Sequence, residues 1–174
     1  MSDKKRIFVE KRGIFDVESP KIFSEIKTIV PHIQDVKVYN IYDLFGIEEN
    51  ELNKVIFNTF VDPVVDILHT ENPAENLHFA TEFLPGQYDQ RADSAQQCIA
   101  LLTGNENSTV RSGKLIELFG VTENEVEKIK NHLINKVESQ EKDLSKLEIP
   151  SEETPDPVMI HEDFIDFSKD QLNE

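Results

Sequence analysis

The sequence predicts an α+β protein in which one antiparallel sheet is covered on one face by helices. Three observations lead to this fold class. Apolar residues alternate in short segments rich in β-branched and aromatic residues, they recur at helical spacing in the segments between, and this order occurs twice along the chain. With 174 residues, the chain can form one domain with a sizeable core and a short additional segment.

The first half of the chain is predicted to contain three strands and two helices. The first helix begins at Ser19-Pro20, an N-cap followed by a first-turn proline, and it ends at Pro31. The second helix follows Gly46 and is stopped by Asp62-Pro63. The predicted strands are residues 6–11, with Ile7 and Val9 on one face, residues 36–42, which are rich in β-branched and aromatic residues, and the short segment 64–68.

The second half opens with an alternating run over residues 77–83, which predicts a strand. Pro85-Gly86 ends this strand, because proline cannot donate a ladder hydrogen bond and glycine permits a turn. A helix follows, and Gly104 lies where this helix would end. Its apolar residues have helical spacing, and they are Ala95, Cys98, Ile99 and Leu102.

A repeat connects the two halves. Residues 44–54 return as residues 118–128, at an offset of 74, with seven of the eleven positions identical. In the second copy, Thr122 and Glu125 form a capping-box pattern worth roughly 1 kcal/mol, and the helix continues to Ile134. Further matches occur at an offset of 73, where Gly13, Asp16 and Ile26 correspond to Gly86, Asp89 and Ile99.

We therefore predict an internal duplication, with pseudo-repeats at about residues 4–72 and 76–138 related by a pseudo-twofold axis. Paired in this way, the strands of both units form one antiparallel sheet with the helices packed on one face. Neither unit alone has enough apolar surface to be comfortably stable, which is a physical reason to keep both in one chain.

The last part of the chain differs from the rest in charge. Residues 136–174 hold twelve acidic and four basic residues and three prolines, so their net charge of −8 is half that of the whole chain. We predict that the domain ends at about residue 140 and that residues 141–174 are the start of a hydrophilic linker. A weak apolar pattern in this tail suggests a short helix; it consists of Ile160, Phe164, Ile165 and Phe167.

The overall composition argues against several classes of function. The chain has 34 acidic and 18 basic residues, a net charge of −16, and such a surface repels nucleic acid and anionic membranes. One cysteine excludes an internal disulfide framework and is typical of a reducing cytosol. No apolar run approaches bilayer length and no signal-peptide pattern precedes the first strand, so we predict a cytoplasmic protein.

The sequence predicts no catalytic, cofactor-binding or metal-binding residue. Cys98 falls in the apolar stripe of its predicted helix, and we interpret it as a packed thiol. No glycine-rich phosphate loop occurs. The five histidines have no ligand spacing, and they are His32, His69, His78, His132 and His161.

A dense polar cluster lies between the strand at residues 77–83 and the helix that follows. A helix start needs only one or two capping residues, and this segment has more. In one interpretation a carboxylate or hydroxyl caps the helix and Arg91 pairs with a neighbouring acid; in the other, the surface docks a polar partner. The candidate contact residues are Gln87, Asp89, Arg91, Asp93 and Ser94.

The same segment carries a resemblance to a known family. Residues 84–98 read LPGQYDQRADSAQQC, which resembles a signature near the N-terminus of the large phosphoribosylformylglycinamidine synthases (FGAM synthases) of purine biosynthesis. Residues 5–11 and 39–45 resemble the first strands of this family, and the resemblance extends over about the first 140 residues. It implies a domain similar to a fused pair of the small PurS subunit, which bridges synthetase and glutaminase in split systems.

The resemblance implies a non-catalytic assembly domain within a larger ligase. The parent reaction uses ATP, magnesium and ammonia released from glutamine, and its sites lie in later domains, so this chain is expected to be an N-terminal fragment without cofactors of its own. The implied partners are the downstream synthetase and glutaminase domains, and self-association of the isolated fragment is left open. The alternative is a free-standing, small-molecule-sensing module of the regulatory ferredoxin-like type. A pocket between the two repeats with a co-purified ligand would favour this alternative, and a dry, filled interface would favour the assembly role.

Overall fold

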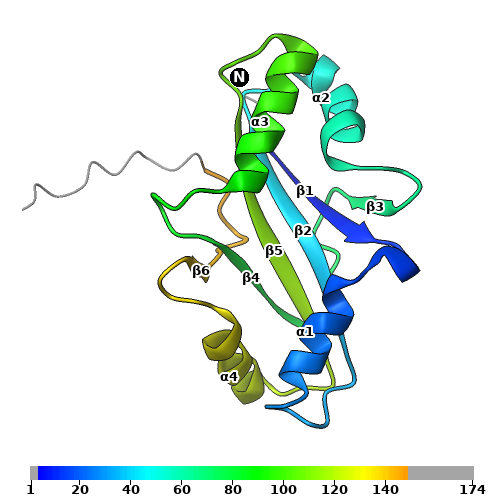
Figure 1. Cartoon of the computed structure of the whole chain (residues 1–174), viewed down its shortest axis with the longest axis vertical. Coiled ribbons are helices and arrows are strands. Elements are labelled where there is room, and N and C mark those ends of the chain that lie inside the picture. The colour runs from blue at the N-terminus through cyan, green and yellow to red at the C-terminus, as the bar shows by residue number, and fades with distance from the viewer. Residues whose placement is uncertain (1–3, 149–174) are drawn as a thin grey trace, which may run out of the picture.

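The computed structural model describes residues 4–148 of the chain, and the predicted α+β class is confirmed (Figure 1). The strands are β1 (Lys4–Lys11), β2 (Asp35–Phe45), β3 (Asp66–His69), β4 (Leu77–Phe83), β5 (Thr109–Phe119) and β6 (Ser139–Glu141). The α-helices are α1 (Glu18–Ile26), α2 (Glu49–Val55), α3 (Gln90–Thr103) and α4 (Glu123–Leu133). A π-helical turn, η2 (Ile56–Phe60), continues α2, and a 3-10 turn, η1 (Gly13–Phe15), precedes α1.

The six strands form one antiparallel sheet in the order β3-β1-β2-β5-β4-β6. The two long strands β2 and β5 lie at its centre and pair along their whole length, with Asn40 opposite Lys114 at the midpoint. Outward from this central pair, one side of the sheet runs β2, β1, β3 and the other side runs β5, β4, β6. The sheet therefore has the same succession of strands on either side of its centre.

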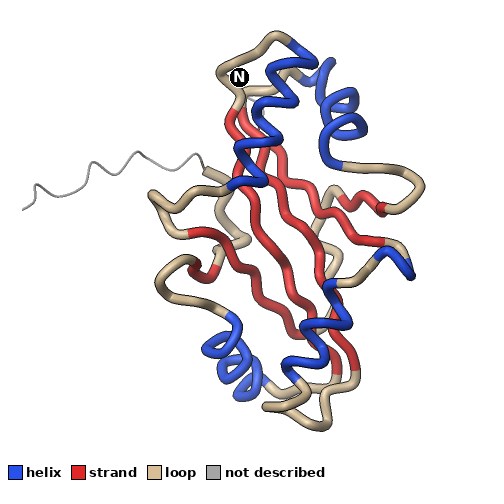
Figure 2. Tube along the Cα trace, in the orientation of Figure 1, coloured by secondary structure: helices blue, strands red, loops and turns tan. Residues whose placement is uncertain are grey.

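All four helices cover one face of the sheet (Figures 1 and 2). The even-numbered residues of β2 face the helices, so Val36 and Val38 pack under α1 and α4, whereas Tyr42 and Leu44 pack under α2 and α3. Each end of the sheet is thus covered by one helix from the first half of the chain and one from the second. Two separate core clusters result, with an opening between them.

The opposite face of the sheet holds a smaller core of Phe8, Tyr39, Ile41, Ala80 and Leu115. No helix covers this face in residues 4–148. Instead, Ala74 from the β3–β4 connection and Leu144 from the segment after β6 pack against it. The segment after β6 was not predicted to be part of the domain.

Most predicted elements are present, but both ends of the first helix were wrong. It begins at Glu18 with Val17 at the N-cap position, and the hydroxyl of Ser19, the predicted N-cap, accepts from the N–H of Val38 instead. The first helix ends at Ile26 rather than at Pro31, because the next residues form shorter i to i+3 turns and the Thr28 hydroxyl donates to the Glu25 carbonyl at 2.8 Å. The second helix ends just before Asp62-Pro63, as predicted: α2 runs to Val55, and the π-helical turn η2 then carries the helix to Phe60, which packs against Tyr42 with ring centroids 4.6 Å apart. Within residues 4–148, no helix is both long and apolar enough to cross a bilayer.

The chain after residue 140 contributes more to the domain than its composition predicts. β6 pairs with the outer edge of β4, and Lys142 continues from it across the second face with its backbone N–H donating to the carbonyl of Ala80 at 2.8 Å. Lys142 is only 6 % exposed. The predicted linker was residues 141–174; residues 141–146 contact the sheet, and residues 149–174, including the predicted short helix, lie outside the described part of the chain.

Candidate functional site

The opening between the two helix pairs is a groove of about 1020 Å³ on the helix-covered face. Its floor includes Tyr42 of β2 and Ser112, Lys114 and Ile116 of β5, and its walls come from both helix pairs. Burial raises the pKa of the Tyr42 phenol, an effect that the positive charge of Arg91 partly opposes. The groove is therefore lined by both halves of the chain and lies over the centre of the sheet.

Asp89 from the predicted cluster has a structural role at the edge of this groove. Its Oδ1 accepts the backbone N–H of Ala92 at 2.9 Å, which makes Asp89 the N-cap of α3. The other carboxylate oxygen accepts the N–H of Ser112 at 3.0 Å, and Oδ1 also accepts the Ser112 hydroxyl at 3.0 Å. β4 pairs with β5 only as far as Gly113, so Asp89 takes over a strand N–H that β4 leaves free.

A similar arrangement occurs in the first half of the chain. Asp16 accepts the N–H of Ser19 at 3.0 Å near the start of α1, and the Ser19 hydroxyl accepts the N–H of Val38 in β2 at 2.9 Å. In both halves, therefore, side chains at a helix start satisfy the helix itself and an N–H of the adjoining central strand. One residue, Asp89, does in the second half what Asp16 and Ser19 do together in the first.

Arg91 extends from the first turn of α3 into the groove. Its guanidinium donates to the Asn40 side-chain oxygen at the midpoint of β2. In the same way, Glu18 at the start of α1 accepts from Lys114 at the midpoint of β5. Asn40 and Lys114 are paired across the sheet, so two helix-to-strand contacts meet at its centre. The first pairs a cation with a neutral amide, and the second is an ion pair.

The other predicted contact residues are divided between local packing and the groove. Asp93 accepts from the Tyr88 hydroxyl at 2.9 Å and from Gln97 at 2.8 Å, and Gln87 donates to the carbonyl of Val137 at 3.4 Å. Neither Asp93 nor Gln87 lines the groove, whereas Ser94 and Arg91 do. The structure thus places two of the five candidate residues in the groove and three in contacts within the α3 corner.

The expectation that Cys98 is a packed thiol was wrong. Its side chain is exposed and lines the groove, since the buried face of α3 is formed by Ala92, Ala95 and Ile99. Cys98 lies three residues after Ala95 but is turned away from the core. Periodicity alone could not distinguish these faces, because a helix that borders a groove has apolar residues on both.

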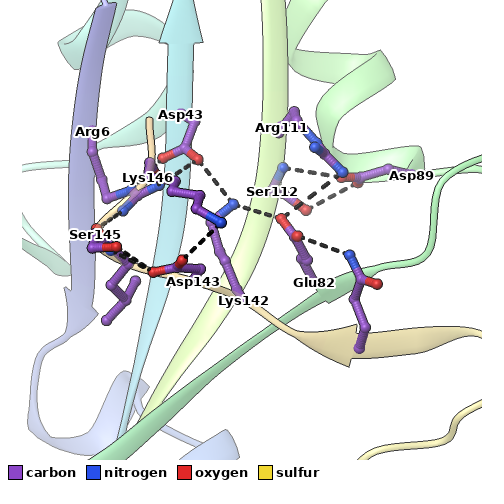
Figure 3. Close-up of polar contacts among 12 residues, drawn as sticks. Arg6, Asp43, Glu82, Asp89, Arg111, Ser112, Lys142, Asp143, Ser145 and Lys146 are labelled. Atoms are coloured by element: carbon purple, nitrogen blue, oxygen red, sulfur yellow. Dashed lines mark hydrogen bonds and ion pairs between the residues drawn. The ribbon is translucent and has the colours of Figure 1, made fainter. Parts of the chain in front are cut away.

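On the opposite face, a network of charged side chains holds the segment after β6 (Figure 3). The Lys142 ammonium lies 2.9 Å from an oxygen of Asp43 and 2.6 Å from one of Glu82. Arg6 binds both oxygens of Asp43, at 2.5 and 2.8 Å, and donates to the carbonyls of residues 144 and 146 at 2.6 and 2.7 Å. Cations and carboxylates alternate in this network, which offsets the cost of burying them.

Gly113 makes room for this network. A Cβ at position 113 would lie 2.7 Å from the carbonyl oxygen of Thr81 and 3.3 Å from the side chain of Lys142. The absence of a side chain lets β4 approach β5 and leaves a path for the aliphatic part of Lys142. This network could not be predicted from the sequence, because its members come from four separate segments of the chain.

Glu117 organises the β3–β4 connection on the same face. One of its oxygens accepts from the N–H groups of Glu75 and Asn76 and from the Asn76 amide, each at 2.9 Å, and the other accepts from the Tyr39 hydroxyl at 2.9 Å. Burial alone would raise the pKa of Glu117, but these hydrogen bonds together hold it below its usual value. Burial and the Glu117 carboxylate raise the pKa of Tyr39.

Neither cluster has the form of a catalytic centre. Within residues 4–148, no three His, Cys, Asp or Glu side chains are grouped closely enough to hold a metal ion. The Lys142 and Glu117 clusters use their polar atoms on one another and on the backbone, whereas the groove is open. The groove is therefore the candidate functional site. A scan of protein-family models and a search of curated proteins found no match to this chain.

Proposed function

We propose that residues 4 to about 140 form a non-catalytic assembly domain of an FGAM synthase, the ATP- and glutamine-dependent ligase of de novo purine biosynthesis in the cytoplasm. The observation that carries the proposal is the segment LPGQYDQRADSAQQC at residues 84–98, which resembles the signature of that family and supplies Arg91 and Ser94 to the groove. In this proposal the domain binds no ATP or magnesium itself, and it docks the synthetase and glutaminase domains against each other.

We also infer that the domain arose by internal duplication. The strand order 3-1-2-5-4-6 is what two equivalent three-stranded units would give if they paired through their second strands. Asn40 and Lys114 are 74 residues apart, which is the offset of the sequence repeat, and they are the midpoint of the central pair. The matching contacts at the starts of α1 and α3 support the same relationship.

The proposed role requires a rigid domain. Ammonia released by a glutaminase must reach the synthetase site without loss to bulk water, so the relative position of the two domains has to be fixed. Helices from both halves cover each end of the sheet, and side chains from both helix starts hold the central strands. Such a body gives a partner domain a surface of constant shape.

A small-molecule-sensing module is the second candidate, and the open groove is the observation that favours it. At about 1020 Å³ the groove is large enough to admit a metabolite. Native mass spectrometry of the purified chain distinguishes the two functions. A stoichiometric small molecule bound to the chain supports sensing, and a ligand-free monomer or dimer supports assembly.

Replacing Arg91 with alanine is expected to separate docking from stability. Arg91 donates to the neutral Asn40 amide and interacts with the Tyr42 phenol, and neither partner is charged, so the free energy of unfolding of the chain should fall by only about 1 kcal/mol. In the full-length synthase, the same change should lower glutamine-dependent activity and leave activity with added ammonia intact. Urea denaturation and the two activity assays measure these effects.

The matched control is Asp89→Ala, which removes three hydrogen bonds within the fold. This change removes the N-cap of α3 and its contacts with Ser112, so the free energy of unfolding should fall by about 2 kcal/mol. If Arg91→Ala lowers both activities equally and destabilises the chain as much as Asp89→Ala does, Arg91 is a structural residue and the docking assignment is wrong.

A further inference from the structure

Two of the basic side chains in the groove have no acidic partner in the described part of the chain. Three acidic and three basic residues line the groove. Lys21 and Arg91 have no carboxylate partner within residues 4–148, although both line the groove. Of the acidic residues, Glu18 contacts Lys114 and Glu25 contacts His132, whereas the side chain of Glu82 pairs with Lys142 on the opposite face of the sheet.

The two unpaired cations contrast with the rest of the chain. The net charge of −16 makes most of the surface unfavourable for an anionic partner. A local pair of cations in such a surface directs a carboxylate to one place and fixes its orientation there. Arg91 donates to Asn40 through one terminal nitrogen, so its remaining N–H groups are able to bind a carboxylate in a bidentate manner.

The groove also offers apolar contacts at its border. Phe83 and Tyr88 line it and remain 40 % and 70 % exposed, and Phe60 lies deeper. Large apolar side chains left exposed beside unpaired cations are typical of protein-binding surfaces rather than of ordinary solvent-facing ones. The groove is open along the surface and is at the upper limit of the volumes of small-molecule sites, which favours a peptide segment as its occupant.

We propose that the groove binds an acidic peptide segment of a partner domain. Its carboxylates pair with Arg91 and Lys21, and its apolar side chains pack against Phe83 and Tyr88. This inference rests on the proposed function, in which the partner is the synthetase or the glutaminase domain of the same enzyme. It adds the chemistry of the docking segment and assigns a contact, Lys21, that lies outside the sequence signature.

The single cysteine of the chain provides a reporter inside the groove. Cys98 is exposed and lines the groove, so an occupant should slow its reaction with Ellman's reagent. The probes are two sets of short peptides: overlapping peptides that cover the synthetase and glutaminase domains of an FGAM synthase, and random-sequence peptides matched to them in acidic content. Binding to the purified chain is measured by fluorescence anisotropy in parallel with the cysteine reaction.

We expect acidic peptides from one segment of the synthase to bind and to protect Cys98. Arg91→Glu and Lys21→Glu should each weaken this binding by about tenfold, because reversal replaces an attraction with a repulsion. The matched control is Lys27→Glu, which makes the same change in charge on a residue that packs over Phe23 and does not line the groove. This control should bind as the unaltered chain does.

The possible results separate this inference from the proposed function. If basic or neutral peptides bind best, if no peptide binds, or if the two reversals have no more effect than Lys27→Glu, the inference is overturned. Synthase peptides that bind without protecting Cys98 overturn it as well, but they leave the assembly function standing. If random acidic peptides bind and protect Cys98 as well as the synthase peptides do, the chemistry of the groove is supported and the proposed function loses its support.

Discussion

Lys142→Ala is expected to lower the free energy of unfolding by about 3–5 kcal/mol, because it leaves two buried carboxylates without their shared cation. The side chains of Lys142 and Asp43 are 5 % and 4 % exposed, and that of Glu82 is 11 % exposed, so water cannot readily take over the role of the ammonium. Urea denaturation measures the loss, and hydrogen exchange should show faster exchange of the amides in β6 and in the segment that follows it.

The control for this change is Lys146→Ala in the same segment. The side chain of Lys146 is 71 % exposed, and its ion pair within residues 4–148 is with Asp143, at 3.4 Å, so its removal should cost less than about 1 kcal/mol. A double change of Lys142→Met and Glu82→Gln should recover part of the stability, because it removes the cation and one of the carboxylates together. If Lys142→Ala and Lys146→Ala have equal effects, the network does not hold the segment after β6.

Glu117→Gln is expected to lower the free energy of unfolding at neutral pH by about 1.5–3 kcal/mol, the value of hydrogen bonds to a charged group. The amide has one oxygen in place of two, so it cannot accept from both the Asn76 and the Tyr39 sides of the carboxylate. The β3–β4 connection should become more mobile as a result. Urea denaturation and hydrogen exchange of residues 70–76 measure the two effects.

The same substitution should change the pH dependence of stability. The folded-state pKa of Glu117 is below its ordinary value, so its contribution is present above the unfolded-state pKa of about 4.3 and is lost as the pH falls through the folded-state pKa. Glu117→Gln should therefore reduce the loss of stability in acid, whereas the exposed control Glu106→Gln should not. Parallel curves for the unaltered chain and Glu117→Gln below pH 4.3 would contradict this assignment.

The order of strands and helices could be predicted from the sequence because it depends on local patterns. The structure contains the strand predicted from the alternation in residues 77–83 and the turn predicted from the proline and glycine after it. It also contains the helix end predicted from Gly104. The hydrogen bonds from Thr122 to Glu125, at 2.9 and 2.8 Å, are likewise a short-range arrangement. Such features need no knowledge of what lies across the sheet.

The site could be predicted only in part, because its other members are distant in sequence. Arg91 and Ser94 belong to a conspicuous polar segment, but Lys21, Glu18 and Lys114 resemble ordinary surface charges. Glu18 could have been found from the repeat, because at the offset of 73 that relates Asp16 to Asp89, Glu18 corresponds to Arg91. Lys142 could not, because an acidic, proline-containing tail gives no local sign that one of its lysines is buried.

Each end of the sheet is covered by one helix from each half of the chain, and this arrangement has a consequence for how the chain folds. α1 and α4 share one core and α2 and α3 share the other, so neither core is complete until both halves of the chain are in place. Both cores depend on the pairing of β2 with β5. Among the paired residues, 45 and 109 are the closest in sequence, and 35 and 119 are the farthest apart. The loop that this pairing closes must therefore form early, at a high cost in chain entropy, before burial can compensate. The two halves are therefore expected to fold together, and a ribosome has to release β5 before the core under α2 and α3 is complete and α4 before the other core is complete.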